Sequence, residues 1–205
     1  MKSKRQLHIT TKHTGKMDGM VSLSTSPEKN SFCKGMAKSD NNVICEKCYA
    51  FRLCKIYPSL EKALARNSEI LSSGPLEEVP RVNVAYFRFN SFGELHNAQH
   101  LANLISIAKH NSRTTFALWT KRKDLVNRCK IEIPSNMIMI YSSSKINPRK
   151  STNPPKNFDK LFSVYSKDYA KKNDIDINCG DRKCFECLKC YDKNSGYDII
   201  REVLK

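Results

Sequence analysis

Eight of the nine cysteines in this chain fall into two groups that could each bind a metal. The first group is Cys33, Cys45, Cys48 and Cys54, and the second is Cys179, Cys184, Cys187 and Cys190. Cysteines spaced by two residues can converge on one soft metal ion or cluster, whereas a disulfide needs only a pair. The sequence therefore predicts metal–thiolate chemistry and leaves Cys129 as an isolated thiol.

The second group supplies enough thiols to saturate one metal centre. Its repeated two-residue spacing is the one by which a short loop wraps a cubane cluster, so Cys179, Cys184, Cys187 and Cys190 favour a 4Fe–4S cluster. Zinc usually takes pairs of ligands on separate knuckles and stays the alternative. A saturated cluster could relay electrons, or it could only staple the end of the chain to the domain.

The first group lies on the loop between an expected strand and an expected helix. In a parallel α/β sheet the loops at the carboxyl ends of the strands form the functional face. Cys33, Cys45 and Cys48 could hold three irons of a 4Fe–4S cluster there and leave the fourth iron open to a ligand. Cys54 could instead complete a closed four-cysteine site, structural zinc included.

Short apolar runs alternate with helical stretches along the chain. Strands are expected at residues 21–25, 82–90, 114–120, 137–141 and 161–165, and helices at 58–72, from 93 to 108, and at 123–129. This alternation predicts crossover units and a parallel sheet. We expect an α/β fold built on an incomplete or open (β/α) barrel-like parallel sheet with a cysteine-rich C-terminal extension.

The chain is expected to form one α/β domain over residues 1–205. Residues 1–57 would hold the N-terminal strand and the first cysteine loop, and residues 174–205 would form the C-terminal cysteine extension. Residues 147–157 contain three prolines and few apolar residues, so they are the best loop candidate.

Polar residues at the ends of three expected strands should meet on the functional face. They are Asn90, Ser91, Gly93 and Glu94, then Lys121, then Tyr141 and Ser142, and we predict that they bind a cofactor or substrate. Lys121 suits contact with an anion, and the hydroxyl groups suit a ribose or carboxylate. Glu94 could equally complement the dipole of the following helix. His96 and His100 are more simply a polar helix face than a metal pair, and no catalytic residue is assigned.

The cysteine loop after the first strand resembles that of the radical S-adenosylmethionine enzymes. Gly93-Glu94 lies where the Gly-Gly-Glu element of that family would lie, although eleven residues separate Cys33 from Cys45 and the family spacing is C-x3-C-x2-C. The resemblance implies an enzyme that binds S-adenosylmethionine at the open iron, with the second cysteine group as an auxiliary cluster.

A closer resemblance covers nearly the whole chain. The motifs are Cys45-Glu-Lys-Cys48-Tyr49-Ala50, Phe87-Arg88-Phe89, Ser91-Phe92-Gly93-Glu94-Leu95, Leu118-Trp119-Thr120-Lys121-Arg122, and the final Cys184-x2-Cys187-x2-Cys190-Tyr191. Together they resemble the phage "gene product eighty-eight" family. This resemblance implies a protein of a phage or mobile element. Because no apolar run approaches the length of a membrane helix and the polar start lacks the apolar stretch of a secretory signal, we expect it in the cytoplasm, which for a phage protein is that of the host.

The net charge of +16 would suit a nucleic-acid partner, but the 36 basic residues are spread among 20 acidic ones. Two hypotheses therefore stay open. The first is an iron–sulfur protein with radical S-adenosylmethionine-like activity, and the second is a metal-stabilised protein that binds nucleic acid or a host partner. The Walker, G-x-G-x-x-G and G-x-S-x-G motifs are missing. No membrane association is expected, and the oligomeric state is not predicted.

Overall fold

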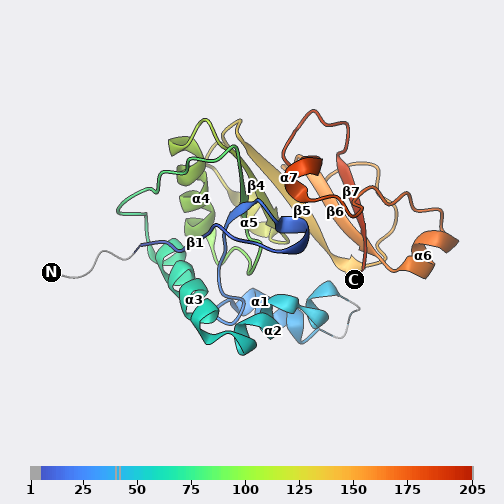
Figure 1. Ribbon diagram of the computed structural model, residues 1–205, viewed down its shortest axis with the longest axis horizontal. Coiled ribbons are helices and arrows are strands. Elements are labelled where there is room, and N and C mark those ends of the chain that lie inside the picture. The colour runs from blue at the N-terminus through green and yellow to red at the C-terminus, as the bar shows by residue number, and fades with distance from the viewer. Residues whose placement is uncertain (1–5, 40, 42, 205) are drawn as a thin grey trace.

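The computed structural model describes residues 6–39, 41 and 43–204. At its centre is a seven-stranded sheet in the order β1-β2-β3-β4-β5-β6-β7 (Figure 1). The strands are β1 (Ile9–Thr10), β2 (Val21–Leu23), β3 (Tyr86–Phe89), β4 (Thr115–Thr120), β5 (Met137–Ile146), β6 (Lys160–Tyr165) and β7 (Ile199–Val203). β1 is antiparallel to β2, and all later neighbours are parallel. The α/β class and the mainly parallel sheet are confirmed; β1 and β7 form the edges of an open sheet.

Helices fill most connections between these strands. Four elements lie between β2 and β3: α1 (Ser31–Ala37), η2 (Ile44–Lys47), α2 (Tyr49–Ile56) and α3 (Pro58–Ser73). The others are η1 (Gly15–Met17), α4 (Ala98–His110), α5 (Lys123–Arg128), α6 (Lys167–Lys172) and α7 (Cys184–Cys187). Figure 1 shows α1 and α2 together on the lower side, α4 on the left and α7 beside β7 on the right. In the described part of the chain, no helix is long and apolar enough to cross a membrane.

The largest apolar core lies between the sheet and the helices α3, α4 and α5. Alternate residues of β3 and β4 point into it, and Phe87, Phe89 and Phe116 are fully buried there. The rings of Phe89 and Phe116 stack with centroids 5.0 Å apart. Burial of each such side chain contributes roughly 2–3 kcal/mol, so this aromatic group anchors the two central strands.

A second, smaller core covers the other face of the sheet. Ala117, Trp119, Ile138 and Ile140 point to this face and pack with Tyr191, which follows the last cysteine. The central strands are therefore buried on both sides, which explains their continuous apolar character. The C-terminal cysteine segment is part of the domain's core and not a free tail.

Several element boundaries differ from the sequence-based expectation. β3 begins at Tyr86 and not at residue 82, and β5 continues to Ile146, well past residue 141. The helix expected from Gly93 begins at Ala98, and the 174–205 segment supplies strand β7. Residues 147–157 are irregular, as expected.

Candidate metal centres

Three cysteines from the connection between β2 and α3 share one neighbourhood. Cys33 lies in α1, where the side-chain oxygen of Asn30 accepts its backbone N–H at 3.2 Å. Cys45 lies in η2, and Cys48 immediately precedes α2. Burial raises the pKa of Cys33 far above its ordinary value, and the nearby charges of Glu94, Cys45 and Cys48 raise it further. Thiols from three separate turns therefore meet beside the ends of the central strands.

Lys121 lies near Cys33 and Cys45, and its positive charge is opposite to that of a thiolate. Burial is the largest cause of the raised pKa of both Cys33 and Cys45, but the Lys121 ammonium acts on both thiols in the lowering direction. The Lys121 ammonium also donates a hydrogen bond to the Ser142 hydroxyl at 3.0 Å. Lys121 can therefore offset thiolate charge or contact an anionic ligand at this edge of the sheet.

Glu94 is 5% exposed, and both oxygens of its carboxylate accept hydrogen bonds from the protein. One oxygen accepts from the Thr120 hydroxyl at 2.5 Å and from the Leu95 N–H at 2.7 Å. The other accepts from the backbone N–H of Lys121 at 2.7 Å. Burial raises the pKa of Glu94, whereas the Lys121 charge and these hydrogen bonds lower it. Glu94 thus ties the loop after β3 to the end of β4.

Two further candidates after β3 shape this loop. Gly93 has a φ of +74°, and a Cβ there would lie 2.3 Å from the carbonyl oxygen of Thr25, so only glycine fits. Asn90 has a φ of 57°. Its backbone N–H donates to the Leu23 carbonyl at 3.0 Å, and its side-chain amide donates to the Trp119 carbonyl at 3.3 Å. Both residues hold neighbouring strand ends together.

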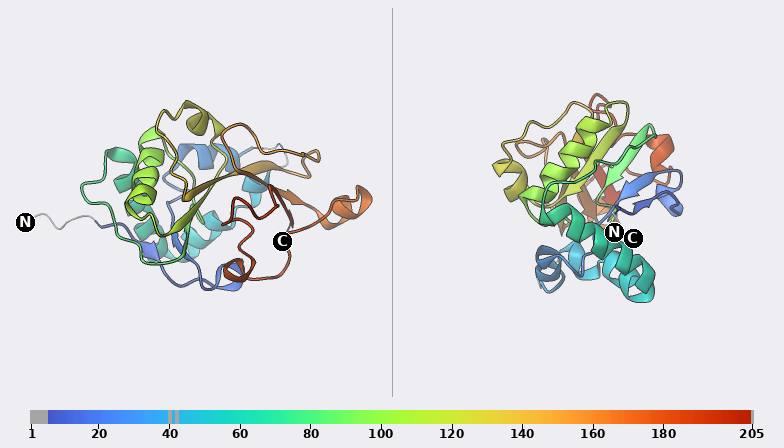
Figure 2. Two further views of the ribbon diagram at one scale, coloured as in Figure 1. Left: turned by 90° about the horizontal axis from the view of Figure 1, so that it is seen from above. Right: turned by 90° about the vertical axis from the view of Figure 1, so that its left-hand side faces the viewer.

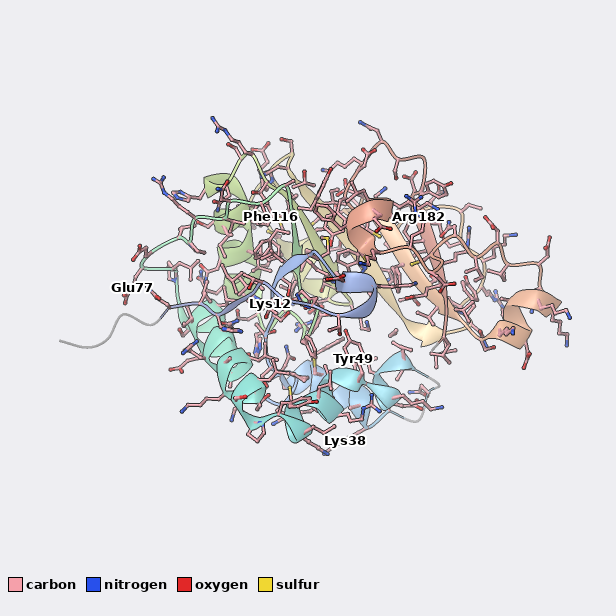
Figure 3. All side chains as sticks on the ribbon, in the orientation of Figure 1. Lys12, Lys38, Tyr49, Glu77, Phe116 and Arg182 are labelled. Atoms are coloured by element: carbon pink, nitrogen blue, oxygen red, sulfur yellow. The ribbon has the colours of Figure 1, made fainter. Side chains whose placement is uncertain are left out.

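Ser91 belongs to a chain of side-chain hydroxyls that no sequence pattern indicated. His13 Nε2 lies 3.0 Å from the Ser22 hydroxyl, which lies 3.1 Å from that of Ser91. The Ser91 hydroxyl lies 2.7 Å from that of Ser24. The Tyr49 hydroxyl donates to the Ser91 carbonyl at 2.7 Å, although Tyr49 as a whole is 53% exposed (Figure 3). This chain joins β2 to the start of α2.

The two candidates on β5 point to opposite faces, because side chains alternate along a strand. Tyr141 packs edge-on against Phe158 with ring centroids 5.5 Å apart, and the Lys123 ammonium lies 4.7 Å from the centre of its ring. Ser142 instead accepts the hydrogen bond from Lys121. Of the pair, Ser142 is the one beside the thiols.

Cys54, the fourth cysteine of the first group, bonds to a carboxylate of α3. Its side chain is buried in α2 and hydrogen-bonds to the carboxylate of Glu61 on α3. Burial and then Glu61 raise the pKa of Cys54 to about 12, and the further charges that act on it come from Glu28 and Cys48. Cys54 is therefore engaged by Glu61 of the following helix.

The four C-terminal cysteines form a second neighbourhood on the other face of the sheet. Cys179 pairs with Glu202 of β7, Cys184 and Cys187 are the first and last residues of α7, and Cys190 follows. Burial raises the pKa of Cys190 to about 12, and the charges of the other three thiols add to this shift. Both Cys184 and Cys190 pack against the core around Trp119.

Lysines fix this second group to the domain. The Lys16 ammonium donates to the Cys179 sulfur at 3.6 Å and to Glu202 at 2.6 Å. The Lys183 ammonium pairs with Asp18 at 2.7 Å. Lys160 is fully buried, and its ammonium donates to Ser195 and Tyr197 at 3.1 Å each. The contacts with Lys16 and Lys183 join the cysteine segment to residues at the beginning of the chain.

Arg88 on β3 faces the second thiol group. Its guanidinium lies 4.0 Å from the centre of the Trp119 ring and donates to the Met17 sulfur at 3.3 Å. Its Nε is buried and makes no hydrogen bond with the residues that the structure describes. Burial raises the pKa of Cys184 and Cys190, and the Arg88 charge opposes that shift. The charge of Arg88 thus acts on two thiols of this group.

Of the two histidines, His100 lies in the core within α4, and His96 is half-buried just before that helix begins, so the expected polar helix face is wrong for His100. His100 is fully buried, and its Nδ1 accepts the His96 backbone N–H at 3.2 Å. Burial lowers the pKa of His100 to about 3, and the charge of His96 adds to the shift. The His100 ring is therefore neutral at physiological pH.

Within each group the thiols lie in one neighbourhood, but they do not form a completed metal-ligand shell. Within residues 6–39, 41 and 43–204, no three His, Cys, Asp or Glu side chains stand in the arrangement of a bound metal ion. The choice of metal and the binding of S-adenosylmethionine both stay predictions.

Comparison with known families supports one of the two resemblances. The chain matches the Gene product 88 family over residues 1–197, a stretch that includes both thiol groups. The relation to radical S-adenosylmethionine enzymes receives no such support. No curated protein and no solved structure is significantly similar to the chain. The chain therefore belongs to the Gene product 88 family of phage proteins.

Proposed function

We propose that this phage protein is an iron–sulfur protein with two unlike clusters. Cys33, Cys45 and Cys48 would hold one cluster with an open ligand position. The second would be closed by the four C-terminal cysteines, Cys179, Cys184, Cys187 and Cys190. The observation that carries the proposal is the division of the thiols into three and four, with Cys54 committed to Glu61.

The donor set fits soft metals. Thiols are the main donors in both groups, since Glu94 beside the first is taken by protein donors and Glu202 beside the second bonds to Lys16. Thiolates select iron–sulfur clusters, zinc or copper over magnesium and calcium. Burial disfavours the thiolate form, so a bound cation would be needed to hold several ionised thiols together. When bound, iron–sulfur clusters supply one-electron transfer.

Residues around the first group would select the ligand at its open position. The Lys121 ammonium beside Cys33 and Cys45 supports a ligand with a carboxylate, and Ser142 orients that ammonium. S-adenosylmethionine carries such a carboxylate, so it is the ligand we propose. Its amino group would need a partner other than the Glu94 carboxylate, whose oxygens already accept three hydrogen bonds.

Arg88 supports a cluster at the second group. A cluster held by four thiolates carries net negative charge, and a guanidinium nearby offsets it. The buried Nε–H of Arg88, which makes no hydrogen bond with the described residues, would be a ready donor to a thiolate sulfur.

The test is metal analysis after anaerobic purification. Iron, sulfide and zinc would be measured in the wild type, in a variant with Cys33, Cys45 and Cys48 changed to Ala, and in one with the four C-terminal cysteines changed to Ala. We expect each variant to lose one cluster's iron and sulfide. The matched control, Cys129→Ala, removes a thiol outside both groups and should retain both clusters.

Binding of S-adenosylmethionine is tested separately by calorimetry on the reconstituted protein. Lys121→Met should weaken that binding and leave the iron content unchanged. Zinc in both groups after iron-replete expression would refute the iron–sulfur proposal, whereas retained iron without S-adenosylmethionine binding would refute only the choice of ligand.

A further inference from the structure

A cleft of about 760 Å³ lies at the amino-terminal edge of the parallel strands. One wall is residues 81–85, which lead into β3, and the other is residues 110–114, which connect α4 to β4. The three-thiol group lies beyond the opposite ends of the same strands. The cleft is therefore separate from the site of the proposed function and does not depend on it.

The side chains that line this cleft carry positive charge and no negative charge. Arg81 and Arg113 supply this charge, the polar residues Asn83, His110 and Ser112 also line the cleft, and no acidic residue does. All five are exposed. Among the residues that the structure describes, no carboxylate forms an ion pair with either arginine. Both guanidinium groups are therefore available to an anion from solution.

The backbone under these side chains is braced across the cleft. Asn111 is buried, and its side-chain oxygen accepts the Val82 N–H at 2.7 Å while its amide donates to the Pro80 carbonyl at 2.9 Å. The Thr114 hydroxyl donates to the Val84 carbonyl at 2.6 Å. These bonds hold the two walls at a fixed separation, so the charged side chains start from a rigid base.

One opposing effect is the C-terminal end of α4, because carbonyl groups at a helix end repel anions. Here those carbonyls are covered. The Asn111 side-chain amide donates to the Ile107 carbonyl at 2.8 Å, and the Asn136 amide donates to the Ala108 carbonyl at 3.0 Å. The exposed guanidinium groups therefore determine the sign of the potential in the cleft.

We propose that this cleft binds phosphate groups of a nucleotide or of a nucleic-acid backbone. Arginine presents paired N–H donors that match phosphate oxygens, and the cleft volume is within the range of roughly 300–1,000 Å³ that small ligands occupy. No Phe, Tyr or Trp side chain lines the cleft, so the large aromatic rings that usually stack on bases are missing from its lining. Recognition is through phosphate and is independent of the base sequence.

The experiment compares two variants that remove the same charge. Arg81→Gln with Arg113→Gln changes the cleft. Lys171→Gln with Lys172→Gln changes α6, which projects from the end of the molecule far from α4 (Figure 2). Binding of a fluorescent single-stranded DNA oligonucleotide is followed by anisotropy across a salt series, and pyrophosphate and ATP are added as competitors. Thermal unfolding checks that both variants fold.

We expect the arginine variant to bind at least about tenfold more weakly and with a shallower salt dependence, because two phosphate contacts are lost. The lysine variant should lose less than about twofold. If ATP or pyrophosphate displaces the oligonucleotide with an inhibition constant below the oligonucleotide's own dissociation constant, the cleft is assigned to nucleotides. If the inhibition constant is higher, the cleft is assigned to nucleic acid. Equal losses in the two variants, or no binding of any of these probes, would overturn the proposal.

Discussion

Replacement of Glu94 by Gln is the sharpest test of how the carboxyl-terminal edge of the sheet is held together. The carboxylate accepts three hydrogen bonds, from the Thr120 hydroxyl at 2.5 Å and from the backbone N–H groups of Leu95 and Lys121 at 2.7 Å each. The two backbone donors bond to different oxygens. An amide has only one oxygen, so in either orientation its NH2 group faces one of these N–H groups.

The magnitude follows from this geometry. One hydrogen bond to a charged acceptor is lost, which is worth about 1.5–3 kcal/mol, and a buried donor is left unsatisfied. The remaining two bonds become neutral and weaker, whereas the desolvation of the carboxylate no longer opposes folding. We expect a net loss of roughly 2–4 kcal/mol in the free energy of unfolding.

The assay is urea denaturation of the metal-free protein, followed by circular dichroism. The control is Glu77→Gln, an exposed carboxylate labelled in Figure 3, which should change the free energy of unfolding by less than about 0.5 kcal/mol. In thermal melts, the Glu94 variant should lose several degrees, at roughly 2–4 °C per kcal/mol for a chain of this size. Equal stability of the two variants would refute the role of Glu94 in joining the two strand ends. Glu94 would then again be a candidate ligand-binding residue.

Three further changes test other parts of the structure. Gly93→Ala should lower the melting temperature by several degrees, because its Cβ would lie 2.3 Å from the Thr25 carbonyl, whereas Gly35→Ala meets nothing within 4 Å and should not. Cys54→Ala should leave the iron content of the first group intact, and Cys48→Ala should lower it; equal iron in both would place Cys54 among the ligands. Unfolded histidine protonates below about pH 6.5 but His100 only near 3, so stability should fall by about 2 kcal/mol from pH 7 to 5. His100→Gln should remove that part of the slope in urea denaturation; an unchanged slope would exclude His100 as its source.

The elements that could be predicted from sequence are those whose burial follows a simple period. β4 and α3 have long apolar patterns, and their bounds lie within a residue of the expectation. The apolar pattern predicts an end of β5 at residue 141, because its second half, from Ser142 to Ile146, is largely polar. That half is held by backbone pairing with β6 and by a bridge from Lys145 to Val43. Backbone pairing of this kind cannot be predicted from the hydropathy of the side chains.

The candidate site was predictable in position but not in its internal contacts. Clustering of cysteines indicated both thiol groups, and the strand ends located Glu94 and Lys121 near the first. Whether Cys54 joins that group depends on its hydrogen bond to Glu61, one turn into the next helix. The spacing of the cysteines does not predict that bond. The role of Arg88 could not be predicted either. Its neighbours, Trp119 and the C-terminal segment, are distant in sequence and come together only in the folded domain.

The ion pair between Lys16 and Glu202 bears on the order in which the two thiol groups can pack into the fold. It joins residues 186 apart in sequence, and the same ammonium contacts Cys179. Loop closure over such a separation is entropically costly, and β7 must be synthesised before it can happen. The first thiol group and Lys121 lie within the first 121 residues and can assemble on a nascent chain. The residues of the three-thiol group are therefore synthesised, and can pack against β4, before the segment that carries the four-thiol group has been translated.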